Sequence, residues 1–419
     1  MKILVLGAGV IGVTTAYVLG RQGHEVVVID KADAVASGAS HGNAGQLAYS
    51  YVDPFPNPSI LKKLPRYMSG RDSGIKIKPV MNTHYYRWGL LFLRNCTAAR
   101  AKCNMDTMLG LARQSMEAMQ RLSTELPGDM LSEIPRGKII LAKTQADMIK
   151  LEKPALEKQA SGFDVETLSR DECISKEPAL STWQGDFCGG LFAKAEGTLD
   201  PLRLCRALEN ASKKQFSVAF KMGHTIKRLN VCDNKVTGVT TNHGSITCDK
   251  VIMCLGAEAN ALLKTIGKSC NIYPMRGYSL TLPAGPQAPK MSVTDPLNKF
   301  VFANFGDKVR IAGFLDANLS EDKIKMRGKM LLEIAKRLWP EAADYSAENH
   351  LWAGYRPMTP SGVPIVETSP VEGLYYNMGH GSLGLTLAAG SAERIAKLVW
   401  QSMQKSSIKR REKNHVLVP

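Results

Sequence analysis

The sequence predicts an α/β protein in which a discontinuous, Rossmann-like nucleotide-binding domain carries an inserted α+β domain built on an antiparallel sheet. Residues 2–29 read as strand, helix and strand around a glycine-rich turn, and a second, fully apolar strand over residues 251–255 ends at Gly256. Residues 272–282 and 299–314 alternate between apolar and polar side chains in the manner of antiparallel strands. The sequence therefore predicts that a second domain, built on an antiparallel sheet, is inserted between the parallel strands of the first.

The other elements follow from local periodicity and from turn residues. Residues 105–126 place apolar side chains at helical spacing, and further helices are expected at residues 320–338 and 391–404. Residues 51–80 are rich in Pro, Gly and Lys and predict a long ordered surface loop. Short strands are expected at residues 217–219, 236–241 and 245–248, with turns at Asp233-Asn234 and His243-Gly244.

The glycine motif has the surroundings that dinucleotide binding requires. Gly7, Gly9 and Gly12 follow a buried strand and open a helix, and Asp30 ends the next strand. Gly7 permits the tight turn, Gly9 lets a pyrophosphate approach the backbone, and Gly12 lets helix and strand pack closely. The helix N-terminus offers free N–H groups, and Asp30 suits a ribose hydroxyl pair and argues against a 2′-phosphate. The motif alone does not separate NAD from FAD.

The residues after the motif favour FAD. Residues 37–46 are dense in small and amide side chains, which suits an extended ligand lying along the backbone. This arrangement resembles the D-amino acid oxidase superfamily of flavoenzymes, and residues 225–226 and 251–257 resemble that family's adenine contact and its late strand with a glycine turn. Motif and resemblance together imply non-covalent FAD held by Gly7, Gly9, Val10, Ile11, Gly12, Asp30, Lys31, Ser40, Asn43, Ala44, Gly45, Gln46, Leu47, Ile226, Gly256, Gly354, Gly381, Ser382, Leu383, Gly384, Leu385 and Thr386.

Three later segments are similar to a narrower group. Residues 273–281, 352–362 and 377–386 resemble the small subunit of bacterial D-amino acid dehydrogenases, and the similarity extends to about residue 398. The resemblance implies an FAD-binding domain over residues 1–80, 190–270 and 340–400, a substrate domain over residues 81–189 and 271–339, and a basic C-terminal tail over residues 401–419.

The resemblance also implies a reaction, namely oxidative deamination of D-amino acids to 2-oxo acids and ammonia through an imino acid. A hydride would pass from Cα to flavin N5, and a respiratory quinone would accept the electrons. Arg356 matches the carboxylate clamp, for which a planar guanidinium is suited because it donates two parallel hydrogen bonds. Tyr278 is the second expected catalytic residue, although an alternating strand also accommodates tyrosine for packing alone.

Two further side chains near these segments have open roles. Arg276 either assists the substrate carboxylate or is one more basic surface residue. The glycines around His380 favour a backbone contact there over acid or base catalysis. Residues 381–386 are expected to direct a helix N-terminus at the flavin C2 carbonyl, where it would stabilise negative charge on the reduced ring.

The net charge of +16 is concentrated in two places. Residues 54–103, termed the basic segment, hold ten Lys/Arg and one acid, Asp72, and the tail adds five cations after residue 404. The basic segment also contains the apolar run 88–93 beside two tyrosines, a composition that suits the anionic face of a membrane and equally suits an ordinary core helix. We expect a cytoplasmic protein that is peripheral on the inner face of the cell membrane.

The composition also bears on other classes of protein. Nine scattered cysteines without a Cys-x-x-Cys spacing predict free thiols in a reducing compartment and no metal site. No nucleic-acid-binding signature accompanies the charge, so no nucleic-acid partner is expected. The alternatives that remain are an FAD-dependent oxidase or dehydrogenase of sarcosine, glycine or a cyclic imino acid such as D-proline or D-hydroxyproline, and a non-catalytic NAD-binding protein. Any partner subunit is unknown.

Overall fold

The glycine motif lies in a βαβ unit, as the sequence predicts. The computed structural model describes residues 1–126 and 137–415, and its chain begins with β1 (Lys2–Leu6), α1 (Val10–Arg21) and β2 (Glu25–Ile29). β1 pairs in parallel with β2 and with β13 (Lys250–Met253), a strand from the middle of the chain. The complete six-stranded sheet has the order β19 (Ile365–Thr368), β20 (Leu374–Met378), β13, β1, β2, β9 (Val218–Lys221).

Successive apolar side chains along these strands point to opposite faces of the sheet, so both faces are buried. Ile3 and Val5 pack with helices on one face. Leu4 and Leu6 pack on the other face against a three-stranded sheet and the short helix α8 (Ala259–Lys264). The helices of the first face are α1, α4 (Ala98–Glu125), α7 (Pro201–Gln215) and α10 (Gly384–His415), and the small sheet comprises β10 (Ile226–Cys232), β11 (Lys235–Thr241) and β12 (Gly244–Thr247).

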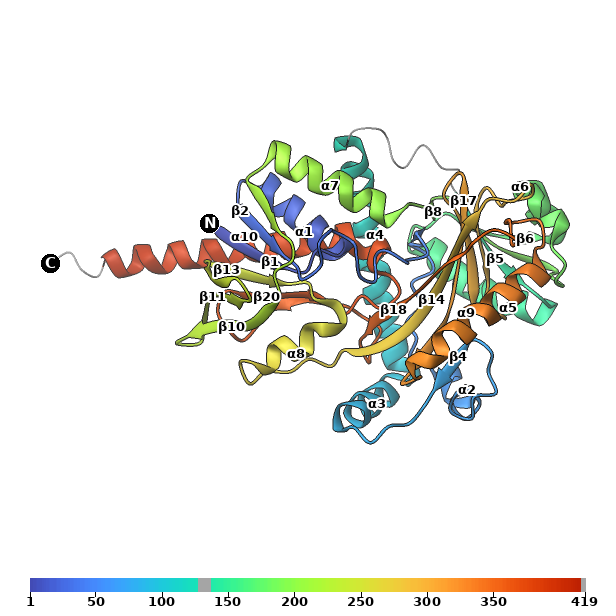
Figure 1. Cartoon of the computed structure of the whole chain (residues 1–419), viewed down its shortest axis with the longest axis horizontal. Coiled ribbons are helices and arrows are strands. Elements are labelled where there is room, and N and C mark those ends of the chain that lie inside the picture. Colours follow the sequence, from blue (N-terminus) through green and yellow to red (C-terminus); the bar gives the residue numbers. More distant parts are fainter. Residues whose placement is uncertain (127–136, 416–419) are drawn as a thin grey trace.

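A second, nine-stranded sheet lies beside the first (Figure 1). It is mostly antiparallel, with parallel pairs between β15 and β5 and between β17 and β4. One face packs against α9 (Ile324–Leu338), α6 (Arg170–Lys176) and η1 (Pro178–Thr182). Its strands are β18 (His350–Met358), β14 (Tyr273–Pro283), β17 (Lys308–Ala317), β16 (Phe300–Asn304), β15 (Ser292–Asp295), β5 (Lys138–Ala142), β7 (Gly189–Ala193) and β6 (Val165–Ser169), with β4 (Ile75–Ile77) beside β17. These two sheets confirm the predicted fold class.

The loop expected at residues 51–80 is wrong in part. It contains α2 (Pro58–Met68) and β4, and it leads into α3 (Thr83–Asn95). α2 begins at an Asn57 side chain that accepts a hydrogen bond from the Ser59 backbone N–H, with proline at the first helical position. Only Ile60 and Tyr67 of α2 are buried, so its apolar stripe is too short to show in the sequence.

The expected domain bounds, with residues 1–80, 190–270 and 340–400 in the FAD-binding domain, stay a prediction. Strand pairing joins β4, β18 and most of β7, which lie within these ranges, to the nine-stranded sheet. β10 was not expected at all, since residues 226–232 contain three charged or amide side chains that face solvent. The remaining described elements are α5 (Gln145–Ala160), the two-stranded pair of β3 (Gln46–Leu47) and β8 (Gly197–Thr198), and the 3-10 helices η2 (Gly256–Glu258) and η3 (Glu321–Lys323).

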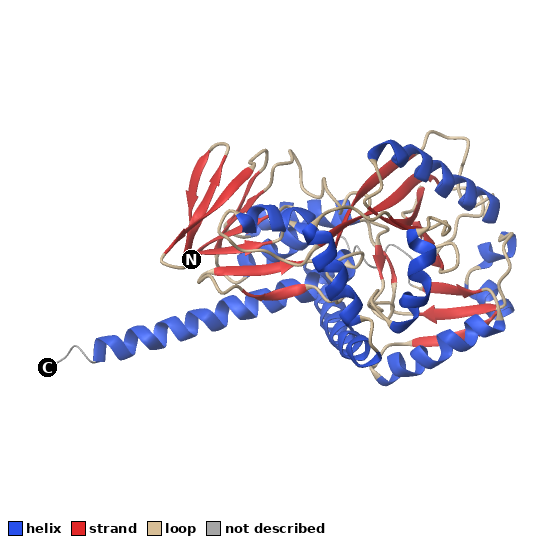
Figure 2. Cartoon of the chain, turned by 90° about the horizontal axis from the view of Figure 1, so that it is seen from below, coloured by secondary structure: helices blue, strands red, loops and turns tan. Residues whose placement is uncertain are grey.

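The last helix is longer than expected at both ends. α10 was predicted over residues 391–404, but it begins at Gly384 and continues to His415. Its C-terminal half projects away from the rest of the molecule (Figure 2). Most of the expected basic tail is therefore helical backbone, while residues 416–419 lie outside the described part of the chain.

Candidate functional site

The turn after β1 brings backbone close to backbone at two glycines. Gly7 has φ +102°, and a Cβ there would lie 2.7 Å from the Cys254 carbonyl oxygen. A Cβ at Gly12 would lie 1.8 Å from the Gly7 carbonyl oxygen. Neither position accommodates another residue, so the tight turn and the close approach of α1 to β1 both depend on glycine.

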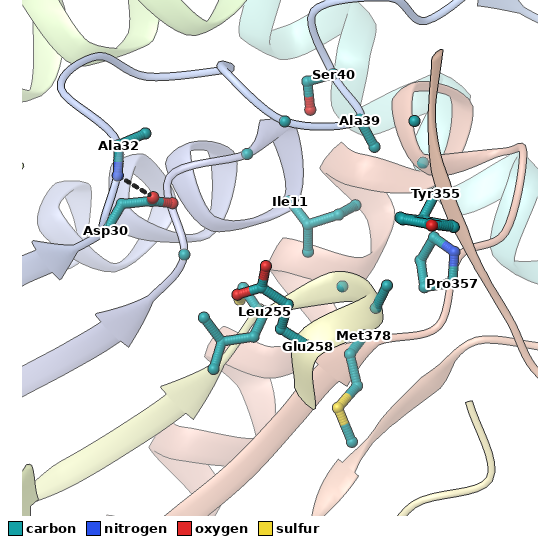
Figure 3. A pocket seen from close by; sticks show the side chains of 18 of the residues that line it. Ile11, Asp30, Ala32, Ala39, Ser40, Leu255, Glu258, Tyr355, Pro357 and Met378 are labelled. Carbon is teal, nitrogen blue, oxygen red and sulfur yellow. Dashed lines mark hydrogen bonds between the residues drawn. The ribbon is translucent and has the colours of Figure 1, made fainter. Parts of the chain in front are cut away.

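Two side chains hold the N-terminal end of α1. Ser40 Oγ accepts a hydrogen bond of 2.9 Å from the Val10 N–H, and the N-cap residue Gly9 has no side chain to do so. The Asp30 carboxylate accepts hydrogen bonds from the N–H groups of Ala8 (2.7 Å) and Ala32 (2.9 Å), as Figure 3 shows for the second of these. The helix end is therefore preorganised to bind an anion, with Asp30 beside it.

A pocket of about 610 Å³ opens at the carboxyl ends of β1, β2, β13 and β20. Ligands bind at this edge in open α/β sheets. Thirteen of the expected cofactor residues line it: Gly7, Gly9, Val10, Ile11, Asp30, Lys31, Ser40, Asn43, Ile226, Gly256, Gly354, Gly381 and Gly384.

The other expected cofactor residues lie outside this lining. They are Gly12, Ala44, Gly45, Gln46, Leu47, Ser382, Leu383, Leu385 and Thr386. Several of these adjoin one another, since Thr386 Oγ1 donates a 3.0 Å hydrogen bond to the Gln46 carbonyl and accepts one of 3.1 Å from the Ala48 N–H. These two hydrogen bonds join the start of α10 to β3 and its following residue. They lie close to Gly384, which lines the pocket.

The pocket also contains residues to which the sequence assigned no cofactor role, among them Glu258 and Trp352. Lys31 and Glu258 form an ion pair of 2.5 Å between the ends of β2 and β13. Trp352 lies so close to Gly42 and Gly354 that a Cβ on either would fall 2.0 Å from its indole ring. The only sign in the sequence that Trp352 belongs to this site was its place in the matched segment 352–362, because contacts between distant segments leave no local pattern.

His380 lines the pocket and carries a polar atom without a partner. It is 4 % exposed, and its Nε2 forms no hydrogen bond with the part of the chain that the structure describes. Burial lowers the pKa of His380 to about 3, so the imidazole is neutral at physiological pH. A buried polar atom without a partner is costly unless a ligand supplies one.

These features fit FAD. The N-terminus of α1 would face the pyrophosphate, Asp30 the ribose, and the glycine-rich wall with His380 and the start of α10 the flavin end. Among residues 1–126 and 137–404, no group of three or more His, Cys, Asp or Glu side chains is arranged to hold a metal ion.

Arg356 lies on β18, directly beside the pocket-lining residues Tyr355 and Pro357. Its guanidinium lies over Gly277, where a Cβ would come within 2.6 Å of Nε. Nη1 donates a 3.0 Å hydrogen bond to the Phe314 carbonyl, and no carboxylate of the described residues forms an ion pair with it. Burial lowers the pKa of Arg356 to about 10, which leaves the side chain charged at neutral pH.

The geometry argues against the role expected for Tyr278. Antiparallel register places Arg356 opposite Met275 and Tyr278 opposite Ala353, so Arg356 and Tyr278 point to opposite faces of the sheet. Tyr278 is 1 % exposed and donates a 2.8 Å hydrogen bond to Asp316. It is part of the core beneath α9. The sequence does not distinguish a tyrosine that faces the core from one that faces the substrate, because both occur at the same two-residue spacing along a strand.

Arg276 shares the face of Tyr278. It is 5 % exposed and donates hydrogen bonds to the Tyr355 hydroxyl (2.6 Å) and to the Leu319 carbonyl (3.1 Å). It is therefore neither a basic surface residue nor a neighbour of Arg356 on the sheet face.

Comparison with known proteins places the chain in a family. Residues 2–398 match the model of the family described as FAD dependent oxidoreductase. The chain belongs to this family. A D-amino acid dehydrogenase 2 of Ralstonia nicotianae is 36% identical over 409 residues, covering 95% of this chain and 96% of that protein. A D-amino acid dehydrogenase of Vibrio vulnificus is 32% identical over 402 residues, again covering 95% of this chain and 96% of the relative.

Solved structures of more distant proteins share the fold of this FAD dependent oxidoreductase. Glycine oxidase from Bacillus cereus superposes with a TM-score of 0.70 at 21% identity, covering 96% of this chain and 95% of that one. L-α-glycerophosphate oxidase from Mycoplasma pneumoniae, solved with FAD bound, gives 0.71 at 18% identity and covers 95% of this chain and 94% of that one. The cofactor of the family is FAD, in agreement with the pocket.

Proposed function

We propose that this flavoenzyme dehydrogenates D-amino acids to imino acids, which water then hydrolyses to 2-oxo acids and ammonia. The observation that carries the proposal is Arg356, a charged guanidinium without an ion-pair partner beside a pocket that fits FAD. The relatives at 32% and 36% identity are D-amino acid dehydrogenases over nearly their whole length, which supports this substrate class.

In the proposed mechanism FAD supplies the hydride acceptor, and the protein supplies orientation and electrostatics. Arg356 binds the substrate carboxylate and so directs the Cα–H toward the cofactor. The N–H groups at the start of α10 face the flavin end of the pocket, where their partial positive charge favours the reduced ring. His380 is neutral at working pH and takes no proton, and its unpartnered Nε2 would be available for a hydrogen bond to bound FAD.

We propose that FAD is held without a covalent bond. Cys254 is the cysteine nearest the glycine turn, and burial raises its pKa to about 12, so it stays an unreactive thiol. Gly9, Gly256, Gly354 and the other pocket-lining residues named above would hold the cofactor.

One test distinguishes dehydrogenation of D-amino acids from the alternative function, which is oxidation of sarcosine, glycine or a cyclic imino acid. The purified protein is mixed anaerobically with D- and L-amino acids, sarcosine, glycine and prolines while the flavin absorbance is followed. We expect bleaching by D-amino acids and slow recovery in air. Bleaching by sarcosine, glycine or a cyclic imino acid alone would establish the alternative function, fast recovery in air would mark an oxidase, and a colourless protein would contradict FAD binding.

We further propose that the enzyme lies on the inner, anionic face of the cell membrane and passes electrons to a quinone there. Among the described residues, no helix is both long and apolar enough to cross a membrane. Trp88 and Phe92 of the basic segment are buried, which fits the core-helix interpretation for those two residues. Six other large apolar side chains of this segment are exposed: Leu61 44%, Met68 46%, Met81 94%, Tyr86 50%, Leu90 55% and Leu93 46%.

The charge of the basic segment points outward as well. Its one acid, Asp72, is 4% exposed and forms a 2.6 Å ion pair with Lys299. Arg66 of α2 pairs with the same carboxylate at 3.5 Å, but among the described residues no other cation of α2 or α3 is paired with an acid of this segment. Apolar side chains set among cations are the combination that an anionic bilayer surface binds.

A further inference from the structure

A cluster of buried charges lies on the same face of the nine-stranded sheet as Arg356. Cross-strand pairing links Thr294, Val301, Ala312, Ser279 and Trp352 in one row across β15, β16, β17, β14 and β18. Directly paired residues share a face, and so do residues two or four apart on one strand. Arg356 is therefore on this face, and so are Ser292 and its partner on β5, Lys138.

Lys138 is a buried cation without a carboxylate partner. It is 0 % exposed, and no described carboxylate forms an ion pair with it. Its ammonium donates a 3.3 Å hydrogen bond to Gln46 Oε1 and lies 4.4 Å from the centre of the Tyr51 ring. A cation so placed is held by one amide oxygen and by the face of an aromatic ring.

Other charged groups face Lys138 from three neighbouring segments. Lys158 of α5 lies 5.6 Å from the same Tyr51 ring and forms a 2.9 Å ion pair with Asp53. Glu196, which precedes β8, accepts hydrogen bonds from the N–H and hydroxyl of Ser50 through Oε1, while Oε2 has no partner. The cluster thus contains two lysines and two carboxylates, but only Lys158 and Asp53 are paired directly.

Gln46 connects Lys138 to the start of α10. Its Nε2 donates to the hydroxyl of Ser292 and, at 3.4 Å, to that of Thr294. Its carbonyl accepts the hydrogen bond from Thr386 already described. The chain of contacts therefore runs from Lys138 through Gln46 to Thr386, one of the residues expected at the flavin.

We propose that Lys138 is a positioning residue of the flavin site: it fixes Gln46 against the sheet, and its buried charge stabilises the reduced cofactor. The inference rests on the proposed function only in that FAD occupies the pocket beside α10. A positive charge in a region shielded from water acts strongly on negative charge that develops nearby. Burial lowers the pKa of Lys138 to about 8, so this charge is present at neutral pH and is lost as the pH rises above that value.

The test measures the midpoint potential of bound FAD by dye-coupled photoreduction, without any amino acid, between about pH 6.5 and about pH 9.5. In the wild type we expect the potential to fall more steeply with pH just above pH 8, because reduction then draws a proton onto Lys138. Lys138→Met should lower the potential at neutral pH and abolish this steeper region. It should also weaken FAD binding by about tenfold, since Gln46 loses a hydrogen bond to a charged donor.

Two further variants make the test decisive. Lys158→Met is the matched control, because it removes a second buried ammonium beside Tyr51 that does not contact Gln46. It should leave the potential at neutral pH unchanged and only move the steeper region to higher pH, since the positive charge of Lys158 lowers the pKa of Lys138. Lys138→Arg keeps the charge at all pH values, so it should retain the potential at neutral pH but lose the steeper region. The proposal is overturned if Lys138→Met and Lys158→Met shift the potential equally, or if Lys138→Arg behaves as the wild type through pH 9.5. Because no substrate is used, these outcomes stand whether or not D-amino acids bleach the flavin.

Discussion

A single arginine carries most of the argument for substrate binding. Arg356 is charged and lies against the sheet, and among the described residues its one hydrogen-bond partner is the Phe314 carbonyl. A guanidinium has five N–H donors, so most of its capacity is left for a ligand. A carboxylate supplies two parallel acceptors in the required plane, and D-amino acids, sarcosine, glycine and the cyclic imino acids all carry one.

We expect Arg356→Met to leave the protein yellow and to lower kcat/KM by about 100-fold or more, equivalent to roughly 3 kcal/mol of transition-state binding. Methionine keeps most of the side-chain volume, so the loss would report the charge. Steady-state kinetics with the best D-amino acid would measure it, with Arg356→Lys as the control that keeps a charge but loses the two-pronged geometry. Wild-type kinetics in Arg356→Met would remove Arg356 from the substrate site.

For His380 we predict an effect of pH on stability, because burial keeps its imidazole neutral in the folded protein. Its pKa is about 3 when folded and about 6.5 in an unfolded chain. Below pH 6.5 the unfolded state takes up a proton that the folded state does not. The free energy of unfolding therefore falls as pH drops from 6.5 toward 3, and it is insensitive to His380 above 7.

Replacing His380 with Asn should remove this part of the acid sensitivity. Between about pH 7.5 and about pH 5 the wild type should lose about 2 kcal/mol more stability than His380→Asn. Denaturant unfolding at the two pH values would measure the difference. An equal loss in both proteins would mean that the pKa of His380 is not lowered in the folded state.

At the scale of elements, one buried ion pair fastens α9 to the sheet. Arg327 and Asp316 are 0 % and 1 % exposed and form two hydrogen bonds of 2.8 and 2.9 Å. Arg327 also donates to the carbonyls of Ser73 and Gly74, the residues that precede β4. Tyr278 adds its hydroxyl to the same carboxylate. The pair thus joins α9, β14, β17 and the turn before β4.

Removing one member of such a pair leaves a buried charge uncompensated. We expect Arg327→Met to lower the free energy of unfolding by about 3–5 kcal/mol. Tyr278→Phe deletes only a hydroxyl and should cost about 1–1.5 kcal/mol, with KM for the amino acid unchanged. Thermal or denaturant unfolding and steady-state kinetics would check both. A large rise of KM in Tyr278→Phe would restore Tyr278 to the substrate site.

The elements predicted from sequence are those whose signal is local. β1, α1, β2 and the glycine turn follow from an apolar strand, a motif and an acid within thirty residues. The turn at Asp233-Asn234 was equally readable, because both residues adopt positive φ, which asparagine and aspartate tolerate. α2 and β10 were missed because few of their side chains are buried.

Long-range pairing accounts for the remaining differences. Nothing within residues 350–358 shows that β18 joins β14 and not the nucleotide-binding sheet, since its partner strand lies about seventy residues earlier. For the same reason the sequence could not show that Tyr278, which was expected near the substrate, lies on the sheet face opposite Arg356. Lys138 carried no motif, and its relation to Gln46 exists only through strand pairing and a side-chain contact.

At the scale of the whole molecule, charge and exposed apolar surface coincide. Of fourteen large apolar side chains that are exposed among the described residues, six lie between residues 61 and 93. α2 and α3 adjoin each other at the lower edge of Figure 1, and both pack their buried residues on the β14 and β18 side of the sheet through Tyr273, Met275 and Met358. The exposed faces of α2 and α3 are therefore attached to the same sheet that carries Arg356.

If this surface binds a membrane, two leucines on α3 should be required. Leu90→Glu combined with Leu93→Glu removes apolar burial and adds negative charge, so we expect binding to anionic vesicles to weaken by roughly tenfold per residue. Ile149→Glu combined with Leu156→Glu is the matched control, because these side chains are exposed by 60% and 66% on α5, outside the basic segment. Flotation with vesicles of phosphatidylglycerol, repeated at high salt, separates the apolar from the electrostatic contribution. Equal loss in both double variants would show that no particular face is used, and full binding by the α3 variant would place the contact elsewhere on the molecule.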